Sequence, residues 1–416
     1  MGDLEFLIAF ARDRKVISNR MSQNNTADIP DFSNTRIAFQ SKTDKQLIET
    51  ARLFRFMNKG WLVDIGTSMG KVAMKLNLPF VKSIIKHTIF KQFCGGVTLS
   101  DCQFTIDHLY EHNTLSILDY GAEAKSAAKD LDIARDELLT AIEFAASNNS
   151  VPVVSCKLTA LIPNHVLEHK QLGSNFSTED KELYAVFWER INIAAARAVE
   201  LSVGVFIDAE ESWMQTAMDD VVRELMALYN RDQCIIYNTY QLYRQDKFAQ
   251  LESDHEVARS SGYILGAKLV RGAYMDKERE YAKEKGIASL IQINKEATDK
   301  DYNKALLYCL DHYEEIGLCN ASHNLQSVQL MAETIHAKEL PQHHKHLNFC
   351  QLQGMSDHLT FNLAQAGYNT AKYVVYGPVK DVTEYLIRRA EENTAVTGEM
   401  SRELHLIETE LKRRNL

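Results

Sequence analysis

The chain has few of the features that mark extended, secreted or membrane-spanning proteins. Its 416 residues include only six prolines and 18 glycines, too few for long disordered linkers. No run of about 18 apolar residues occurs, so no transmembrane helix is expected. The first dozen residues carry acids and lack a long apolar stretch, so no signal peptide is expected. The remaining composition, 45% hydrophobic and 25% charged, is that of a soluble globular protein with a large core.

Paired cysteines are also missing. The seven cysteines are odd in number, scattered, and form no C-x-x-C pair. Several lie inside apolar runs that resemble strands. We therefore expect buried, reduced thiols in a reducing compartment. The positions are Cys94, Cys102, Cys156, Cys234, Cys309, Cys319 and Cys350.

A basic surface, a Rossmann nucleotide motif and a metal motif are absent as well. The net charge of -9 argues against nucleic-acid binding. There is no G-x-G-x-x-G, and residues 66–72 resemble a phosphate loop that is one residue short and lacks Ser or Thr after Lys71. His343, His344 and His346 are neighbours, but adjacent side chains point apart on any regular element. We expect no metal site.

The pattern of apolar residues divides the chain into three parts. Residues 1–100 form a predicted helical arm, in which Leu47, Ala51, Phe54 and Met57 recur at helical spacing; so do Val81, Ile84, Ile85 and Ile89, whereas residues 20–34 read as a loop. Residues 101–397 alternate strand-like runs with helical patterns, and residues 398–416 form a charged helix expected to lie on the surface.

Eight strand candidates indicate an α/β fold, a distorted (βα)8 TIM-like barrel with an N-terminal helical extension. Their number and their spacing of roughly 20 to 50 residues match that barrel. An open doubly wound sheet is the alternative, but it usually has fewer strands. The candidates are Leu115–Tyr120, Val151–Lys157, Leu201–Asp208, Gln233–Asn238, Tyr263–Arg271, Gly317–Ser322, Leu347–Leu352 and Ala371–Tyr376.

Polar residues gather where these strands end. In a (βα)8 barrel the carboxyl ends of the strands form the active site. Any one such residue is more often a strand terminator than a catalyst, but a series of seven is harder to dismiss. They are Asp119, Lys157, Asp208, Asn238 with Gln241, Lys268–Tyr274, Ser322–Asn324 and Gln351–Gln353.

The run Lys268–Tyr274 keeps two cations, Lys268 and Arg271, in a strand that leads into Gly272. Cations in a buried strand need an anionic partner. Strand-end solubility is the bland interpretation. The functional one is a bound anion or an electron-rich ring, which Gly272 would allow to approach the backbone closely.

Near the C-terminus, Tyr385, Arg388, Arg389 and Glu392 fall on one face of a predicted helix. A solvated charged stripe is the bland interpretation. However, two adjacent guanidiniums can hold one small carboxylate with several charge-assisted hydrogen bonds.

Two further strand ends invite a functional interpretation. Asp208 and Lys157 could pair across adjacent strands and tune a proton acceptor. Ser322, His323 and Asn324 could cap the next helix, contact a cofactor, or do both.

Taken in order, these segments resemble the proline dehydrogenase family. The strongest matches are Lys268–Tyr274 and Tyr385–Asn393, and weaker ones are Lys157–Ala160, Ile207–Glu210, Asn238–Gln241 and Tyr376–Val379. The resemblance spans roughly residues 90 to 397. It implies a distorted (βα)8 barrel with non-covalent FAD that oxidises L-proline to Δ1-pyrroline-5-carboxylate, by hydride transfer from proline C5 to flavin N5, and passes electrons to a quinone.

The resemblance also implies roles for individual residues. Asp208 and Lys268 are expected to act in catalysis. Substrate contacts are expected from Lys157, Leu269, Tyr274, Tyr376, Tyr385, Arg388 and Arg389. Flavin contacts are expected from Ala209, Asn238, Lys268, Val270, Arg271, Gly272, Ala273, Ser322, His323 and Glu392.

Departures from the bacterial pattern point to the single-function, mitochondrial-type branch. Lys268 stands where many bacterial members have Arg, Met275 where they have Trp, and Asn238 where they have Gln. The length of 416 residues leaves no room for a fused aldehyde dehydrogenase, so a separate pyrroline-5-carboxylate dehydrogenase is expected downstream. The expected location is the cytoplasm, or the matrix side of the mitochondrial membrane in a eukaryote, with peripheral membrane contact left open.

Two rival functions remain at this point. One is a Schiff-base barrel enzyme of the aldolase type, with Lys157 or Lys268 as nucleophile and no flavin. The other is a non-catalytic barrel that binds an amino acid.

Overall fold

The computed structural model describes residues 29–58, 85–121, 127–173, 176–394 and 399–416. Three sequence predictions lie wholly or largely outside these ranges: the phosphate-loop resemblance at 66–72, the helical pattern that begins at Val81, and most of the predicted loop at 20–34.

All strands of the sheet run parallel and close into a barrel. The strand β9 pairs with both β8 and β2, which joins the two ends of the strand order β2 to β9. The predicted (βα)8 barrel is confirmed, and closure excludes the open sheet. The strands are β1 (Cys94–Gly96), β2 (Leu115–Tyr120), β3 (Val153–Cys156), β4 (Gly204–Ile207), β5 (Ile236–Gln241), β6 (Leu265–Val270), β7 (Ile316–Ala321), β8 (Leu347–Leu352) and β9 (Thr370–Tyr376).

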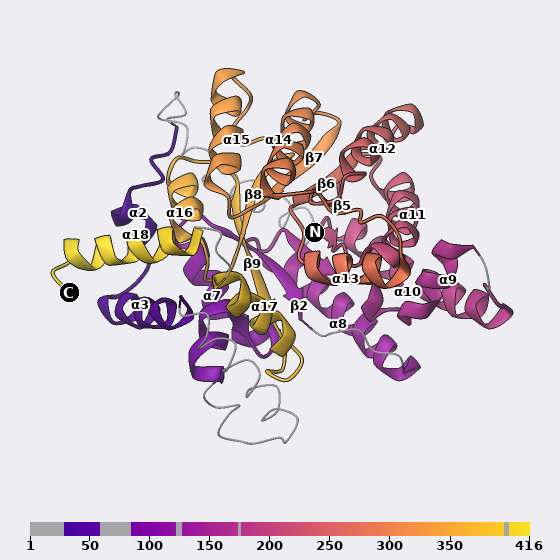
Figure 1. The fold of residues 1–416 in the computed structure, drawn as a ribbon, viewed down its shortest axis with the longest axis horizontal. Helices are drawn as coiled ribbons and strands as arrows, with labels where there is room; N and C mark the ends of the chain where they lie inside the picture. Colours follow the sequence, from indigo (N-terminus) through magenta and orange to yellow (C-terminus); the bar gives the residue numbers. More distant parts are fainter. Residues whose placement is uncertain (1–28, 59–84, 122–126, 174–175, 395–398) are drawn as a thin grey trace, which may run out of the picture.

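Helices surround this sheet (Figure 1). Several begin at residues whose side chains accept a hydrogen bond from the first helical turn; Thr98 and Ser177, for example, form capping boxes with Asp101 and Asp180. The helices are α2 (Thr35–Ala38), α3 (Asp44–Met57), α6 (Lys91–Phe93), α7 (Leu99–Tyr110), α8 (Ala128–Ala146), α9 (Asn164–Leu172), α10 (Thr178–Glu200), α11 (Ser212–Tyr229), α12 (Lys247–Ser261), α13 (Met275–Lys285), α14 (Lys295–Asp311), α15 (Leu325–Ala337), α16 (Asp357–Gln365), α17 (Thr383–Thr394) and α18 (Glu399–Arg413), with a π-helical turn at Lys86–Phe90 and a 3-10 turn at Leu158–Ala160.

The short strand β1 was not predicted. It pairs with the last residues of β9, with Cys94 opposite Val375 and Gly96 opposite Tyr376. The pairs of β8 stop at Tyr373. The strand β1 therefore pairs with the last part of β9, beyond the residues that pair with β8. The sheet thus begins before residue 101, where the barrel was predicted to start.

Strand alternation divides the core into two layers. Residues such as Val205, Ala267 and Leu318 face the surrounding helices, whereas Phe206 and Cys319 face the inside of the barrel. Both faces of each strand are buried, which is why the strands read as continuous apolar runs in the sequence.

The C-terminal helix α18 packs beside α3 and α2, so segments from both ends of the chain lie together on one side of the barrel (Figure 1). Its residues Ile407 and Leu411 are buried, as is Glu410, which accepts hydrogen bonds from Arg414. The helix α18 thus exposes one face, whereas its other face is part of the core. The helix α3 is confirmed, with its four periodic apolar residues buried.

A buried ionic cluster joins these terminal segments to the barrel. Lys372 on β9 lies 2.9 Å from the carboxylate of Asp357, and Lys42 lies 3.2 Å from the other oxygen of the same group. Burial alone would raise the pKa of Asp357, but the two lysines outweigh it and lower that pKa. Glu403 on α18 accepts the Ser356 N–H at 2.9 Å, and burial followed by the charge of Asp357 raises its pKa to about 7.

All seven cysteines lie within the described residues, and all are free. Six are buried and Cys234 is partly so, as the sequence predicts. Among the described residues, none of the helices combines the length and apolar character needed to cross a bilayer.

We expect Asp357→Asn to lower the free energy of unfolding by about 3–5 kcal/mol, because it leaves the buried Lys372 without its anion. The control is Asp311→Asn, which removes the half-exposed partner of Lys338 and should cost less than about 1 kcal/mol. Urea denaturation of both variants measures the difference. Equal losses would show that the Asp357 cluster does not stabilise the fold in this way.

Candidate active site

Four charged side chains meet inside the barrel near the carboxyl ends of its strands. Lys268 Nζ lies 2.6 Å from Asp208 Oδ1. Lys157 Nζ lies 3.3 Å from Asp119 Oδ2 and 3.8 Å from Asp208 Oδ2. The predicted pair of Asp208 and Lys157 exists, but the closest cation to Asp208 is Lys268, and Asp119 is the closer partner of Lys157.

These contacts determine the ionisation of the cluster. Burial alone would raise the pKa of Asp208, but Lys268 and then Lys157 outweigh it and lower that pKa to about 2. Burial alone would lower the pKa of Lys157, but Asp119 and Asp208 outweigh it and raise that pKa. Burial raises the pKa of Asp119, against the lowering effect of Lys157. The two carboxylates thus carry no more charge than the two ammonium groups, and the cluster has no net negative charge.

Tyr373 and Ser155 complete the cluster and were not predicted. The Tyr373 hydroxyl lies 2.6 Å from Asp208 Oδ2 and 2.9 Å from Ser155 Oγ. Ser155 Oγ in turn donates to Asp208 Oδ1 at 3.0 Å. The Lys268 ammonium lies 4.9 Å from the centre of the Tyr373 ring, a cation–π contact. Successive residues of a strand point to opposite faces, so Tyr373 and Tyr376, three residues apart on β9, lie on opposite faces. This alternation is the signal that could have placed Tyr373 inside the barrel.

A second buried carboxylate, Glu210, lies two residues beyond Asp208. Its oxygens accept from Thr159 Oγ1 at 2.7 and 2.9 Å. Burial raises the pKa of Glu210 to about 7, against the lowering effect of the Thr159 hydrogen bond. Gln241 on β5 donates to the Glu210 carbonyl at 3.1 Å, and its buried Oε1 has no hydrogen-bond partner among the described residues.

Arg271 lies just past β6 and is held by a network of its own. Its Nε donates to Asp299 at 2.7 Å, and its two Nη atoms donate to Ser322 Oγ at 2.8 Å and Ser327 Oγ at 3.0 Å. The guanidinium also lies over the Tyr302 ring, at 4.4 Å from its centre. The predicted cation of this strand end thus points toward the start of α15.

His323 is buried in the connection between β7 and α15 and is held in one tautomer. The Leu352 N–H donates to its Nε2 at 3.4 Å, so its Nδ1 carries the proton and donates to Ser356 Oγ at 2.9 Å. Burial, followed by the charges of Arg389 and Lys372, lowers the pKa of His323 well below its usual value. The imidazole is therefore neutral. Asn324 forms the helix cap that the sequence suggests, accepting from Ser327 N at 3.0 Å.

The helix α17 brings the two adjacent arginines to this end of the barrel. Arg388 lies over the Tyr274 ring, with 6.0 Å from its Cζ to the ring centre, and Arg389 lies 5.4 Å from the centre of Tyr385. Arg389 is buried, and its charge is felt by His323. The Tyr385 hydroxyl reaches the Phe93 carbonyl at 3.4 Å. The predicted shared face is thus directed at the mouth of the barrel.

Three predicted contact residues face the helices instead of the interior. Leu269 packs in the outer apolar layer. Tyr376 lies in the same layer and donates to Glu137 on α8 at 2.8 Å. Asn238 donates to the buried Asp219 on α11 at 3.0 Å.

Their roles in binding substrate or flavin stay predictions, and the neighbouring residues of each strand point to the opposite face. Near the ends of these three strands, the inward positions are held by Gln241 on β5, Lys268 on β6 and Val375 on β9.

The other predicted flavin-side residues lie at strand ends without a contact that defines a role. Ala209 follows β4, Val270 ends β6, and Ala273 is exposed beyond it. Gly272 has φ +127°, and a Cβ there would come within 2.5 Å of the Tyr243 ring, so packing against Tyr243 already requires glycine. Glu392 belongs to α17, but its side chain lies outside the described residues.

Comparison with known proteins identifies the family. The sequence model described as "Proline dehydrogenase" matches residues 102–402. This chain belongs to the proline dehydrogenase family. The resemblance read from the sequence is thereby confirmed.

Two relatives illustrate how similar this family member is to studied proteins. It is 32% identical to the hydroxyproline dehydrogenase of Xenopus laevis over 413 residues, which cover 90% of this chain and 88% of that protein. It is 36% identical over 255 residues to the protein named proline dehydrogenase 1, mitochondrial, of Drosophila melanogaster, covering 59% of this chain and 37% of that one.

The solved structures agree on the fold. The crystal structure of proline utilization A from Bdellovibrio bacteriovorus, inactivated by N-propargylglycine, superposes with a TM-score of 0.67 at 21% identity. The match covers 95% of this chain but only 42% of that one. This proline dehydrogenase family member therefore spans less than half of the length of that structure and of the Drosophila relative.

Glu210 gives a test of the electrostatics of this site. Its folded-state pKa of about 7 lies above the ordinary value of 4.5, so the carboxyl stabilises the fold fully only at low pH. That contribution is lost as the pH rises through about 7. We expect the free energy of unfolding of Glu210→Gln, relative to that of the wild type, to increase by about 2–3 kcal/mol as the pH rises from about 5 to about 8.

Thermal or urea denaturation at both pH values measures this gain. Because Glu403 also titrates near pH 7, only the difference between wild type and variant isolates Glu210. The exposed Glu252 on α12 gives the control Glu252→Gln. A difference between Glu210→Gln and the wild type that does not change with pH would contradict the raised pKa.

Proposed function

We propose that this chain is an FAD-dependent proline dehydrogenase that oxidises L-proline to Δ1-pyrroline-5-carboxylate and passes electrons to a quinone. The observation that carries the proposal is that Tyr274 lies close both to Arg388 of α17 and to Lys157 of the cluster around Asp208, in a member of this family. The arginines suit a small carboxylate, and the inner cluster suits the ring of a cyclic amino acid.

The arginines supply the anchor for the substrate carboxylate. Arg388 lies over the ring of Tyr274 and Arg389 over the ring of Tyr385, and Arg389 is buried. Two such groups bind a carboxylate with several charge-assisted hydrogen bonds and orient it. A ligand held in this way has its ring directed toward the inner cluster.

The inner cluster governs the amine. Removing hydride from the carbon next to nitrogen requires a neutral amine, whose lone pair stabilises the product. Asp208 and Asp119 are already matched by Lys157 and Lys268, so the cluster offers no net negative charge to hold an ammonium. We infer that the site favours the neutral amine of proline and keeps the ring in a dry, ordered pocket.

The residues at the mouth of the barrel fit a flavin. The unpartnered Oε1 of Gln241 can accept a hydrogen bond from a ring N–H. The neutral imidazole of His323 and the guanidinium of Arg271 lie at neighbouring strand ends. The start of α15, next to Ser322 and Arg271, suits phosphate groups. We propose that Gln241, Arg271, Ser322 and His323 hold FAD, with Lys268 on its reactive side. When bound, the flavin would accept the hydride.

The Schiff-base alternative receives less support. A nucleophilic lysine needs a lowered pKa, which makes the amine neutral. The pKa of Lys157 is raised by its carboxylates, and Lys268 is paired with Asp208 at 2.6 Å. A non-catalytic binding protein would keep the arginines and still lack turnover, so it is separated only by experiment.

The partners follow from the same proposal. L-proline is the substrate, a quinone is the acceptor, and a separate pyrroline-5-carboxylate dehydrogenase consumes the product. The name of the Drosophila relative includes "mitochondrial", which supports the matrix side of the mitochondrial membrane as the location. Peripheral membrane contact belongs to this proposal because a quinone resides in the bilayer.

The visible spectrum tests the function. We expect the purified protein to be yellow with flavin absorbance, and to bleach when L-proline is added without oxygen. In Arg388→Met, flavin content should be unchanged while kcat/KM for proline falls about 30- to 1,000-fold, equivalent to a loss of about 2–4 kcal/mol. The matched control is Arg279→Met, an exposed arginine on α13.

Three outcomes would contradict the proposal. A colourless protein with lysine-dependent activity would support the aldolase-type enzyme. A yellow protein that L-proline does not bleach would support a binding protein. Unchanged proline kinetics in Arg388→Met would remove Arg388 from the carboxylate anchor.

Ring specificity gives a second test, because one relative is named a hydroxyproline dehydrogenase. Tyr385 lies one helical turn before the two arginines and faces the same ligand. A hydroxyl on the pyrrolidine ring must fit beside this bulky side chain or lose its water uncompensated. We expect L-proline to be preferred over 4-hydroxyproline by about ten- to a hundredfold in kcat/KM.

The same ratio should shrink in Tyr385→Ser, which opens space and keeps a hydroxyl. Exposed Tyr110 on α7 provides the control Tyr110→Ser. A wild type that prefers hydroxyproline, or an unchanged ratio in Tyr385→Ser, would show that Tyr385 does not set the specificity.

A further inference from the structure

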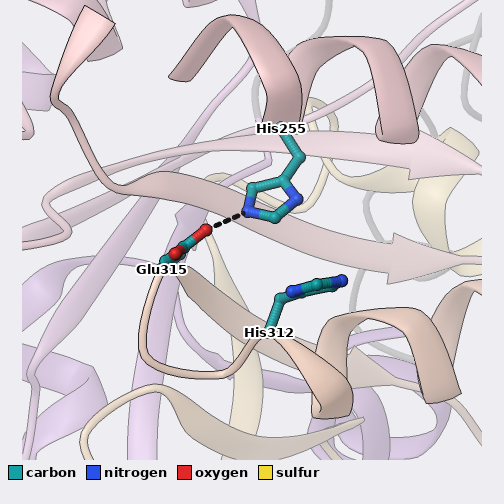
Figure 2. Close-up of side chains that lie close together, drawn as sticks. All are labelled: His255, His312 and Glu315. Carbon is teal, nitrogen blue, oxygen red and sulfur yellow. Dashed lines mark hydrogen bonds and ion pairs between the residues drawn. The ribbon is translucent and has the colours of Figure 1, made fainter. Parts of the chain in front are cut away.

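Three side chains meet at the end of the barrel opposite the arginines. His255 comes from α12, His312 immediately follows α14, and Glu315 immediately precedes β7. Their ligand atoms all lie within 4.8 Å of one another. Figure 2 shows the His255 ring and the Glu315 carboxylate facing each other, with the His312 ring beside them. We propose that these three residues bind a zinc ion or a similar divalent transition metal.

The ligand set has the chemistry of zinc. Two imidazoles and one carboxylate are a common protein contribution to a four-coordinate site, with a fourth position left for water. The single carboxylate reduces the charge of a divalent ion to +1. Nitrogen ligands also discriminate against magnesium and calcium, which prefer oxygen.

The backbone holds the three ligands in place without the metal. The N–H groups of Glu315 and Ile316 both donate to the His312 carbonyl at 2.9 Å, which fixes the turn between the two ligands. The Glu315 carbonyl accepts from Leu265 N at 3.0 Å, which ties it to the start of β6. The rings of His255 and His312 already lie 4.8 Å apart between centres. The side chains therefore need only close inward.

Tyr308 orients the buried ligand. Its hydroxyl lies 2.8 Å from His255 Nδ1, while His255 Nε2 lies 2.8 Å from Glu315 Oε2. A tyrosine hydroxyl both donates and accepts. It can therefore donate to Nδ1 while Nε2–H donates to Glu315. It can equally accept from Nδ1–H when the lone pair of Nε2 faces a metal.

The two ends of this ligand pair differ in exposure. The His255 side chain is buried, so it is shielded from solvent and held by its neighbours. Glu315 is half exposed, which leaves an entry path from solvent.

The site should stabilise the protein without affecting the mouth of the barrel. It would join α12 to the turn between α14 and β7, two segments far apart in the sequence. At the amino-terminal end of a (βα)8 barrel, changes affect stability more than chemistry. We therefore expect zinc to raise the melting temperature and to leave substrate kinetics unchanged.

The experiment uses the full chain without a histidine tag, after treatment with a chelator. Zinc binding is measured by calorimetry and by the melting temperature, and Co²⁺ is added to read coordination from its visible absorption. We expect one tight site that His312→Ala and Glu315→Gln each weaken at least about tenfold, the scale seen for lost metal ligation or support. Tyr308→Phe should weaken it less.

The control is His165→Ala. His165 and His169 on α9 form another histidine pair near a carboxylate, Asp180, and could bind zinc adventitiously. We expect this variant to keep the tight site. The proposal is overturned if wild-type zinc binding is no tighter than that of His312→Ala, if His165→Ala removes it instead, or if Co²⁺ shows no imidazole-ligated spectrum.

Discussion

The balance of charge around Asp208 is the interaction on which the interior of this barrel depends. The carboxylate is shared by Lys268 at 2.6 Å and Lys157 at 3.8 Å, and it accepts from Tyr373 at 2.6 Å. Removing one member would leave another charge buried without compensation, which costs more than the pair contributes when intact. The cluster therefore acts as one unit.

This unit also couples the strands. With Asp119, its members come from β2, β6 and β9 and from the ends of β3 and β4, so their separations depend on barrel closure and register. A slip of one residue in any of these strands would turn a polar or charged side chain into the outer apolar layer. Closure of the barrel and neutrality of its interior are thus two requirements met by the same residues.

The barrel and the position of its active end could be predicted from the sequence, because both depend on local patterns. Eight apolar runs separated by helical patterns predict a parallel barrel, and polar residues at their ends predict where chemistry gathers. The sequence could not say which neighbouring residue at a strand end faces inward, because both faces of a parallel strand are buried and both carry apolar residues. The side chains of Leu269, Tyr376 and Asn238, which the resemblance predicts to contact substrate or flavin, lie on the outer face.

Long-range partners were equally hidden. Asp119 was noted only as a strand end, and its role as the partner of Lys157 depends on packing between strands. The tail at 398–416 reads as a solvated helix because it is rich in charge. Its buried face and the Glu403 contact depend on α3 and on the segment around Asp357, which no local pattern connects to it.

The strand β7 shows how the fold can separate stability from chemistry. Glu315 immediately precedes it, and Ser322 and His323 immediately follow its last residue, Ala321. At 3.3 Å per residue, its six residues span about 20 Å. A ligand bound at the first end would hold the strand in its register without reaching the second. The mouth of the barrel would then gain rigidity from a site that contributes no atom to the reaction.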